Sequence, residues 1–273
     1  MEIKQVWSVY WSATGNTEKI VKETAGALAE QLSCSVKTID FTPQEARKSG
    51  MSFAAGDLVV IGMPTYAGKI PNKMLPYVQE QIAGNGALAV PVVTFGNRSF
   101  DNSLAELSAC LENNGFHTVA AGAFACRHAF TDVLAPGRPN AEDLALAREL
   151  ALRAAEKVKA MTELPAPVQV PGDAAAPYYV PKGTDGQPAK FLKAKPCTDL
   201  SKCSQCGICA HLCPMGAISP DNAAEVPGIC IKCQACVRKC PAGAKYFDDP
   251  AFLSHVAMLE QNFTAPKENQ IFA

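Results

Sequence analysis

Twelve cysteines, nine of them between residues 197 and 240, constrain the fold of this 273-residue chain more than any other feature. Eight of the nine form two runs of identical spacing, C-x2-C-x2-C-x3-C-P, at residues 203–214 and 230–241. At this spacing three thiolates wrap around one face of an iron–sulfur cube, and the fourth is displaced toward a second cube. The C-terminal part of the chain is therefore expected to bind metal.

Two other uses of dense cysteines suit this pattern less well. The first residues show no basic segment followed by an apolar stretch, so no secretory signal is expected and the thiols should stay reduced, which disfavours disulfides. A structural zinc ion takes four tetrahedral ligands and needs neither a third cysteine six residues after the first nor a proline after the fourth. Cys197, six residues before the first run, is interpreted as a surface or packing residue first, and as a spare thiol or rescue ligand second.

The cysteine segment resembles bacterial-type ferredoxins over about 60 residues. The resemblance implies two [4Fe-4S] clusters, each with three cysteines from one run and the fourth from the other. One cluster is assigned to Cys203, Cys206, Cys209 and Cys240, and the other to Cys230, Cys233, Cys236 and Cys213. A small α+β ferredoxin domain is therefore expected at residues 197–250.

The first 160 residues alternate strand-like and helix-like segments, which is typical of a parallel sheet covered on both faces. The strands are predicted at residues 6–11, 36–40, 58–62, 92–95 and 118–125. Amphipathic stretches lie between them, and the last helix is expected to start at Asn140, with Asp143 three residues on. Pro91 has no N–H to donate to a ladder and is placed at the mouth of strand four. Five strands with intervening helices indicate a doubly wound α/β domain.

The alternation ends at Leu164, where the composition changes. Seven prolines lie among the 32 residues from Pro165 to Pro196, which favours an extended connector over helix or sheet. Tyr178 and Tyr179 indicate that this connector packs on another part of the protein. The predicted division is an α/β domain at 1–163, a proline-rich linker at 164–196, the ferredoxin domain at 197–250 and a short, poorly patterned tail at 251–273.

The first predicted strand leads into Ser-Ala-Thr-Gly-Asn-Thr at residues 12–17 and then into a helix. Hydroxyl and amide side chains, a flexible glycine and the free N–H groups of a helix N-terminus form a cradle for an anion. The loop has no lysine, which suits a monophosphate bound by neutral donors. An ordinary N-cap is the alternative, because the same residue types favour helix starts. The candidate phosphate ligands are Ser12, Thr14, Gly15, Asn16 and Thr17.

Loops at residues 62–69 and 95–102 follow strands three and four, so three loops are expected to meet at one end of the sheet. With S-x-T-G-x-T intact, this half resembles flavodoxins, and the whole chain resembles flavodoxin–ferredoxin fusion proteins of anaerobic microbes. The resemblance implies a flavodoxin-like doubly wound, five-stranded parallel sheet of order 2-1-3-4-5 that binds FMN. The residues it implies at the isoalloxazine ring are Pro64, Thr65, Tyr66, Ala67, Gly68, Lys69, Phe95, Gly96, Asn97, Arg98, Phe100 and Asp101.

The ring loops depart from the flavodoxin pattern in their aromatic residues. Many flavodoxins place the flavin between two aromatic rings, whereas Tyr66 is the only aromatic residue in the first ring loop. The second face of the ring is expected to be covered by Phe95, Phe100 or a linker tyrosine, or to be open. Arg127 and His128, after the fifth strand, either reach the ring or lie at the surface.

Charge and hydropathy exclude other classes of function. The formal net charge of −1 disfavours capture of nucleic acid or of an anionic membrane. The longest apolar run, residues 87–95, is too short to span a bilayer. A cytoplasmic protein is therefore expected, without membrane insertion and without a nucleic-acid partner.

The predicted function is electron transfer, in which two [4Fe-4S] clusters and FMN relay electrons between soluble redox partner proteins in anaerobic metabolism. The alternative is a small flavin-dependent reductase whose clusters feed FMN for reaction with a quinone, NADPH or another organic acceptor. No nucleophile–base pair stands out, and no dinucleotide fingerprint follows a strand. A homodimer is left open, because the 32-residue connector permits the clusters to face the flavin of their own chain or of a neighbour.

Overall fold

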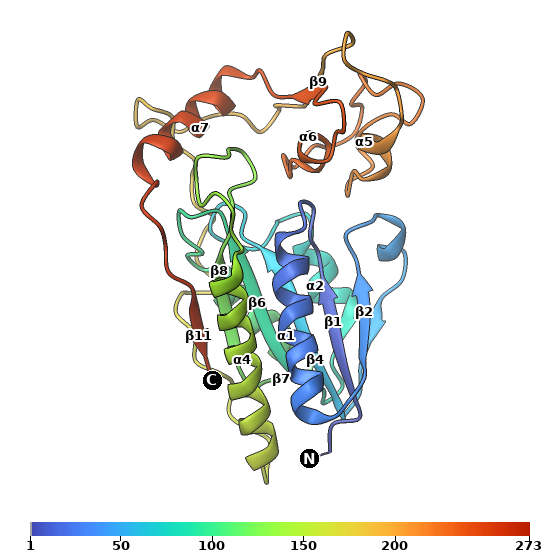
Figure 1. Cartoon of the computed structure of the whole chain (residues 1–273), viewed down its shortest axis with the longest axis vertical. Helices are drawn as coiled ribbons and strands as arrows, with labels where there is room; N and C mark the ends of the chain where they lie inside the picture. The colour runs from blue at the N-terminus through green and yellow to red at the C-terminus, as the bar shows by residue number, and fades with distance from the viewer. Residues whose placement is uncertain (1) are drawn as a thin grey trace.

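The central sheet is built from short runs of branched and apolar residues, and the computed structural model describes it within residues 2–273 (Figure 1). Along the sheet the strands are β11 (Gln270–Phe272), β8 (Ala121–Ala125), β6 (Leu88–Phe95), β4 (Asp57–Pro64), β1 (Gln5–Tyr10) and β2 (Val36–Asp40), with β7 (His117–Thr118) beside β6. Every residue of β6 and β8 is buried, as expected for strands covered on both faces.

The order of the parallel strands confirms the predicted doubly wound fold. Strands β2, β1, β4, β6 and β8 correspond to the five predicted strands, and their order in the sheet is 2-1-3-4-5. The edge beyond β8 was not predicted: β11, from the end of the chain, adds there as an antiparallel strand. The main sheet therefore has an antiparallel edge on an otherwise parallel core.

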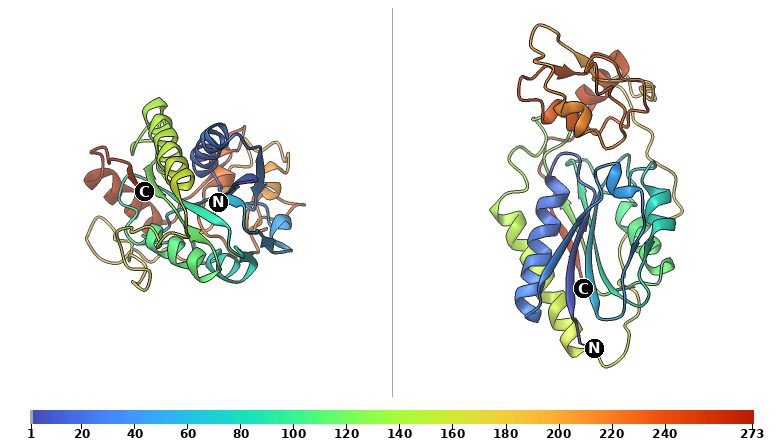
Figure 2. Two further views of the ribbon diagram at one scale, coloured as in Figure 1. Left: turned by 90° about the horizontal axis from the view of Figure 1, so that it is seen from below. Right: turned by 90° about the vertical axis from the view of Figure 1, so that its right-hand side faces the viewer.

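Helices cover both faces of this sheet (Figure 2). Helices α1 (Asn16–Leu32) and α4 (Ala141–Ala160) pack their apolar residues on one face. Helices α2 (Leu75–Gln81) and α3 (Ser103–Asn113) contribute to the apolar cluster on the other face. The predicted start of the last helix is confirmed, because Asn140 and Asp143 exchange side-chain to backbone hydrogen bonds of 3.0 and 2.8 Å at the N-terminus of α4.

The position predicted for Pro91 is wrong. Pro91 lies inside β6, in register with Ile61 of β4. The carbonyl of Ala89 accepts from Val119 on the β7–β8 side, and the strand alternates, so the nitrogen of residue 91 faces that same side. At this point β6 changes its partner from β7 to β8, so the ladder has a gap and needs no N–H donor from residue 91. A proline is tolerated in a central strand at such a break.

The smaller elements lie outside the main sheet. A two-stranded parallel pair and a 3-10 turn flank the α/β half, and an antiparallel pair with two short helices organises the cysteine segment. They are β3 (Met51–Ser52) with β5 (Ile82–Ala83), η1 (Glu45–Arg47), β9 (Cys197–Thr198) with β10 (Lys245–Tyr246), α5 (Ile208–His211) and α6 (Ala235–Arg238).

The tail is ordered, contrary to the expectation of a poorly patterned segment. It forms helix α7 (Pro250–Asn262) and then strand β11. The side chain of Asp249 caps α7 by accepting from the N–H of Phe252 at 2.8 Å, and Pro250 opens the helix. An aspartate directly before a proline is a helix-start signal that apolar periodicity alone did not reveal.

The cysteine segment lies over the end of the sheet where the parallel strands finish, and α7 lies beside it (Figure 2). Both termini lie at the opposite end (Figure 1). The connector between the halves runs along the α/β half, where Tyr178 donates its hydroxyl to the carbonyl of Ile70 at 2.9 Å. Within residues 2–273, no helix combines the length and apolarity needed to cross a membrane.

Candidate functional site

The two cysteine runs fold into loops of the same backbone shape. The residue before the second cysteine of each run has a left-handed φ, +54° at Gln205 and +57° at Lys232. The residue after it does so as well, +73° at Gly207 and +66° at Gln234. Each loop then enters a single helical turn, α5 or α6, that carries the third cysteine. The repeat in sequence is therefore a repeat in structure.

The repeat extends beyond the spacing recognised in the sequence. Both runs end in C-P-x-G-A, and the glycines, Gly216 and Gly243, have φ values of +57° and +58°. This turn brings the N–H of Ala217 to 3.2 Å from the sulfur of Cys213, and the N–H of Ala244 to 3.3 Å from that of Cys240. Backbone N–H groups aimed at ligand sulfurs stabilise thiolates and tune cluster potentials.

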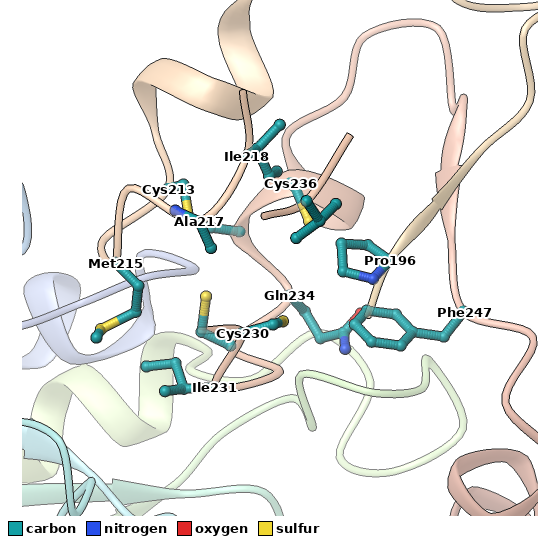
Figure 3. Close-up of a pocket in the computed structure, with 13 residues that line it drawn as sticks. Pro196, Cys213, Met215, Ala217, Ile218, Cys230, Ile231, Gln234, Cys236 and Phe247 are labelled. Atoms are coloured by element: carbon teal, nitrogen blue, oxygen red, sulfur yellow. The ribbon is translucent and has the colours of Figure 1, made fainter. Parts of the chain in front are cut away.

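The eight thiols line two separate cavities, each of about 350 Å³. We call Cys203, Cys206, Cys209 and Cys240 the outer set, and Cys213, Cys230, Cys233 and Cys236 the inner set. These are the two sets of four that the ferredoxin resemblance implies. Figure 3 shows sulfurs of the inner set directed toward the space between them, above Met215 and Ile231.

The donor chemistry of both cavities fits a [4Fe-4S] cluster. Four thiols surround each space, and the rest of the inner wall is almost entirely apolar. In the part of the chain that the structure describes, no three His, Cys, Asp or Glu side chains lie close enough together to share one metal ion. The thiols stand instead around a wider space, which suits a multi-iron cube. When bound, such clusters accept and release single electrons.

The inner set is the more deeply buried of the two. Burial raises the pKa of the Cys236 thiol to about 12 and also raises the pKa of Cys230 and Cys233. In the outer set Cys206 is exposed to solvent. Although burial acts to raise the pKa of Cys240, surrounding backbone N–H groups lower it overall. The inner ligands are thus on the whole less exposed than the outer ones, among which Cys206 reaches solvent.

Cys197 belongs to neither set. It lies in β9, paired with Tyr246, and its thiol donates to a carboxylate oxygen of Asp248 at 3.1 Å. Burial and this carboxylate raise the pKa of the thiol. The ninth cysteine therefore packs against the β9–β10 pair, in line with the interpretation that the sequence favoured.

The phosphate-loop residues converge at the N-terminus of α1. Gly15 has a φ of +96°, and a Cβ placed there would meet nothing within 4 Å, so the loop surrounds open space. In the described chain, the backbone N–H groups of residues 13–16 make no hydrogen bond, whereas the side-chain amide of Asn16 donates to the carbonyl of Arg127 at 3.1 Å. The Ser12 hydroxyl accepts from the N–H of Glu18 at 3.1 Å, and the buried Thr17 hydroxyl lies 2.7 Å from that of Thr94. Free amides around an open space fit a phosphate group.

The two ring loops lie side by side next to this cradle. Tyr66 and Lys69 form a tight bridge through Ala67 and Gly68, both with a left-handed φ. The carbonyl of Gly68 accepts from the N–H of Asn102 at 2.8 Å, and a Cβ on Gly68 would lie 2.5 Å from Asp101. This contact requires glycine and fixes the first ring loop against the second.

Several side chains expected at the ring have structural partners instead. Lys69 is buried and bonds to Glu106 at 2.9 Å and to the carbonyls of two connector residues. Asn97 is fully buried and bonds to the backbone of residues 263–267, which fixes the tail. Phe95 and Phe100 pack against each other in the core. The remaining polar edge consists of backbone groups, Thr65, whose hydroxyl lies 2.7 Å from that of Ser103, and the Arg98–Asp101 ion pair.

The connector supplies an aromatic ring at this edge. The N–H of Tyr179 donates to the carbonyl of Ala67 at 2.8 Å, and the guanidinium of Arg98 lies 4.0 Å from the centre of the Tyr179 ring. Of the two residues after the fifth strand, Arg127 is half-buried and ion-paired with Asp132 at 3.4 Å. His128 packs behind Gly96, where burial lowers its pKa to about 3. Its imidazole is therefore neutral.

The inner set packs directly on the first ring loop. Cys233 and Ala235 belong to the same apolar cluster as Trp11, and Tyr66 packs against that cluster. The rings of Trp11 and Tyr66 meet edge to face with their centres 5.9 Å apart. Burial, followed by the thiols of Cys233 and Cys230, raises the pKa of Tyr66 well above its usual value. Sequence reasoning missed Trp11, although an indole at the end of strand one, directly before the phosphate loop, was a visible signal.

Polar contacts hold the two halves in this arrangement. Arg238, in the second cysteine run, donates to the carbonyls of Ala129 and His128 at 2.8 and 3.1 Å and to Asp132 at 2.6 Å. On the other side, Arg47 donates to the carbonyl of Pro214, the last residue of the first run. Both arginines make contacts that a freely tethered domain would not make.

Comparisons with known proteins give matches in both halves. The model of the flavodoxin domain matches residues 8–104, and the model of the 4Fe-4S dicluster domain matches residues 202–245. A comparison with curated proteins gives no match.

Three solved structures illustrate the similarity. A flavodoxin from the domain Archaea is 17% identical, with a TM-score of 0.41, over 57% of this chain and 99% of that one. A flavodoxin of Streptococcus pneumonia TIGR4 is 17% identical, with a TM-score of 0.40, over 56% and 99%. The rubredoxin oxygen:oxidoreductase of Desulfovibrio gigas is 20% identical, with a TM-score of 0.36, over 58% and 37%.

The order of the two matches agrees with the architecture inferred from the motifs. The phosphate loop lies within the first match, and all eight ligand cysteines lie within the second. The chain is therefore a flavin and iron–sulfur redox protein in which a flavodoxin domain is followed by a 4Fe-4S dicluster domain.

Proposed function

We propose that this protein is an electron carrier of anaerobic metabolism, in which two [4Fe-4S] clusters connect an FMN with redox partner proteins in the cytoplasm. The outer set holds the cluster that exchanges electrons with a partner. The inner set holds the cluster next to the flavin. No substrate other than electrons is turned over at the ring.

One observation carries this proposal: the inner set packs on the ring loop of the same chain. Cys233 shares an apolar cluster with Trp11, against which Tyr66 packs, and Arg238 and Arg47 hold the halves together. This placement supports electron exchange within one chain and not between chains. It also supports a covered ring, because the cysteine segment lies over the end of the sheet where the ring loops meet (Figure 2).

The FMN phosphate is proposed to lie in the loop of residues 12–17, held by free amides and the hydroxyl of Thr14. The isoalloxazine ring is proposed to contact the backbone of residues 64–69 and 96–101, with Tyr66 on the side of the inner set. Bound FMN supplies a group that accepts one or two electrons. The protein residues hold it against the inner cluster and exclude water.

The outer set is the proposed contact with partner proteins. Cys206 is exposed, whereas Cys233 and Cys236 of the inner set are buried. Electron transfer between proteins requires close approach of a cofactor to the surface, and the outer set, with Cys206 exposed, offers a closer approach than the inner set. This difference in burial gives the proposed path of the electrons, which runs from the partner protein to the outer cluster, then to the inner cluster and then to FMN.

The proposal is tested by asking which reductant the holoprotein accepts. The anaerobically purified protein is mixed with reduced methyl viologen, with NADPH, or with NADPH and a quinone, and flavin and cluster absorbance are followed separately. We expect viologen to reduce the clusters and the flavin, with no NADPH oxidation. Reduction of the flavin by NADPH with steady turnover would contradict the carrier function and support the reductase alternative.

A further inference from the structure

Lys245, in the cysteine segment, has a buried ammonium group without an acidic partner. The residue is 3% exposed and lies in β10, in register with Thr198 of β9. Within the described residues, no Asp or Glu oxygen lies within 4.0 Å of its Nζ, which donates only to the carbonyl of Ala223. A buried cation is strongly unfavourable unless an opposite charge compensates it.

The missing negative charge lies in the outer cavity. Lys245 lines that cavity together with the four thiols of the outer set and Ala223. An oxidised [4Fe-4S] cluster with four thiolates carries a net charge of about −2, which would be the largest charge near the ammonium. The ammonium counteracts the effect of burial on the pKa of Cys209, and also on that of Cys236 in the inner set. Its influence therefore reaches the outer set and extends to the inner one.

The inner cavity has no charged side chain in its lining. Its lining residues besides the thiols are apolar, apart from Gln234. Lys232, in the inner run, is also buried without an acidic partner among the described residues, but it does not line the cavity, and its Nζ donates to the carbonyls of Leu192 and Cys230 at 2.6 and 3.2 Å. Its charge acts to lower the pKa of Cys230, as that of Lys245 does for Cys209. An apolar wall opposes the extra negative charge that reduction adds, whereas a fixed cation favours it.

We propose that Lys245 is a fixed counter-charge that raises the reduction potential of the outer cluster above that of the inner cluster. Reduction takes a cluster from a net charge of about −2 to about −3, so a nearby cation stabilises the reduced form more than the oxidised form. Lys245 acts through the cluster and is a positioning residue, not a ligand. This inference rests on the two clusters of the proposed function and sets a difference between them.

The test compares the two cluster potentials in holoprotein variants by anaerobic redox titration, followed by the EPR signals of the reduced clusters. We expect Lys245→Met to lower the higher of the two potentials, with a change of about tenfold or more in its equilibrium constant, which is about 59 mV for one electron. The lower potential should move less. Lys202→Met is the matched control. Lys202 directly precedes the ligand Cys203, but its charge is exposed and paired with Asp199.

Two further variants keep the test decisive. Lys245→Arg retains the charge and should keep the higher potential near the wild-type value, and Lys245→Gln replaces Lys245→Met if the methionine variant does not assemble its clusters. The inference would be overturned if Lys245→Met or Lys245→Gln shifted the higher potential no more than Lys202→Met does. It would also be overturned if the shift were confined to the lower potential. Either result would leave the proposed electron carrier intact. Absence of two clusters in the wild-type protein would overturn both.

Discussion

The proposed phosphate site depends on single residues of the loop at 12–17. Thr14 lies in a loop whose amides are free, and its hydroxyl makes no hydrogen bond within the described residues. A hydrogen bond to a charged group contributes about 1.5–3 kcal/mol. We therefore expect Thr14→Val to weaken FMN binding by about tenfold or more, measured by fluorescence titration of the flavin-free protein.

Riboflavin is the control for this variant because it lacks the phosphate. Its affinity should be the same for Thr14→Val and for the wild type. An equal loss of affinity for both flavins would show that the substitution disturbs the ring site or the fold and that the loop does not hold the phosphate.

His128 gives the protein a pH dependence of stability at the residue scale. Burial, followed by the charges of His255, Arg238 and Arg98, lowers its pKa to about 3, whereas an unfolded histidine titrates near 6.5. Between these two values the unfolded state binds one proton more than the folded state. The free energy of unfolding therefore falls as pH falls through this window, and the contribution is fully present above about pH 6.5.

The variant His128→Gln should remove this dependence. Urea unfolding of both proteins at about pH 7 and about pH 5 gives the comparison, and we expect the wild type to lose more stability between them than the variant. Equal losses in both proteins would show that other groups cause the acid sensitivity.

The sequence predicted those parts of the candidate site that depend on the spacing of residues along the chain. It did not predict the parts that depend on which distant residues a side chain contacts. The cysteine spacing implied two sets of four, and the same two sets surround the two cavities. Asn97 and Lys69 looked equally suited to a ring edge, yet they bind the tail and Glu106. Their partners lie in segments far along the chain, so no local pattern identified them.

At the scale of elements, the strand β11 is the addition that the sequence did not reveal. Three residues at the chain end pair with β8, and the Asn269 side chain accepts from the N–H of Ala125 at 2.9 Å and donates to Asp143 at 2.7 Å. Deletion of residues 268–273 leaves the N–H of Ala125 without this acceptor and removes one of the donors to Asp143, which keeps Arg138 and Asn140. We expect the free energy of unfolding to fall by about 2–4 kcal/mol in chemical denaturation.

Deletion of Ala273 alone is the matched control, because it removes the last residue and leaves β11 intact. The longer deletion also exposes the edge of β8, so we expect it to associate in size-exclusion chromatography. Unchanged stability and a monodisperse profile would mean that β11 contributes little.

The elements themselves were predictable in proportion to their length and regularity. The five parallel strands and α1, α3 and α4 follow from branched runs and apolar periodicity. Helix α2 has only seven residues, which is too short for a clear period. Pro91 was misplaced because a general rule about proline in strands does not show where a ladder has a gap.

At the scale of the whole molecule, the cysteine segment lies over the end of the flavodoxin domain, and the proposed electron route depends on this placement (Figure 2). The sequence left this open, because a 32-residue connector permits many placements. The contacts of Arg238 and Arg47 select one of them. We therefore expect electron transfer between the clusters and the flavin to be first order, with a rate constant independent of protein concentration.

Stopped-flow absorbance after partial reduction with methyl viologen measures this rate constant. Arg238→Ala should slow the transfer by loosening the contact with Ala129 and Asp132, whereas Arg153→Ala, which removes an exposed pair with Glu149, should not. A rate constant proportional to protein concentration would place the transfer between chains.

The cofactor content of the anaerobically purified protein tests the central claim most directly. Iron, acid-labile sulfide, zinc and FMN are measured per chain together with the absorbance spectrum. Two [4Fe-4S] clusters and one flavin predict about eight irons, about eight sulfides and about one FMN, without zinc. About eight irons without flavin, even after FMN is added, would contradict the account and leave two clusters on an α/β domain that binds no flavin.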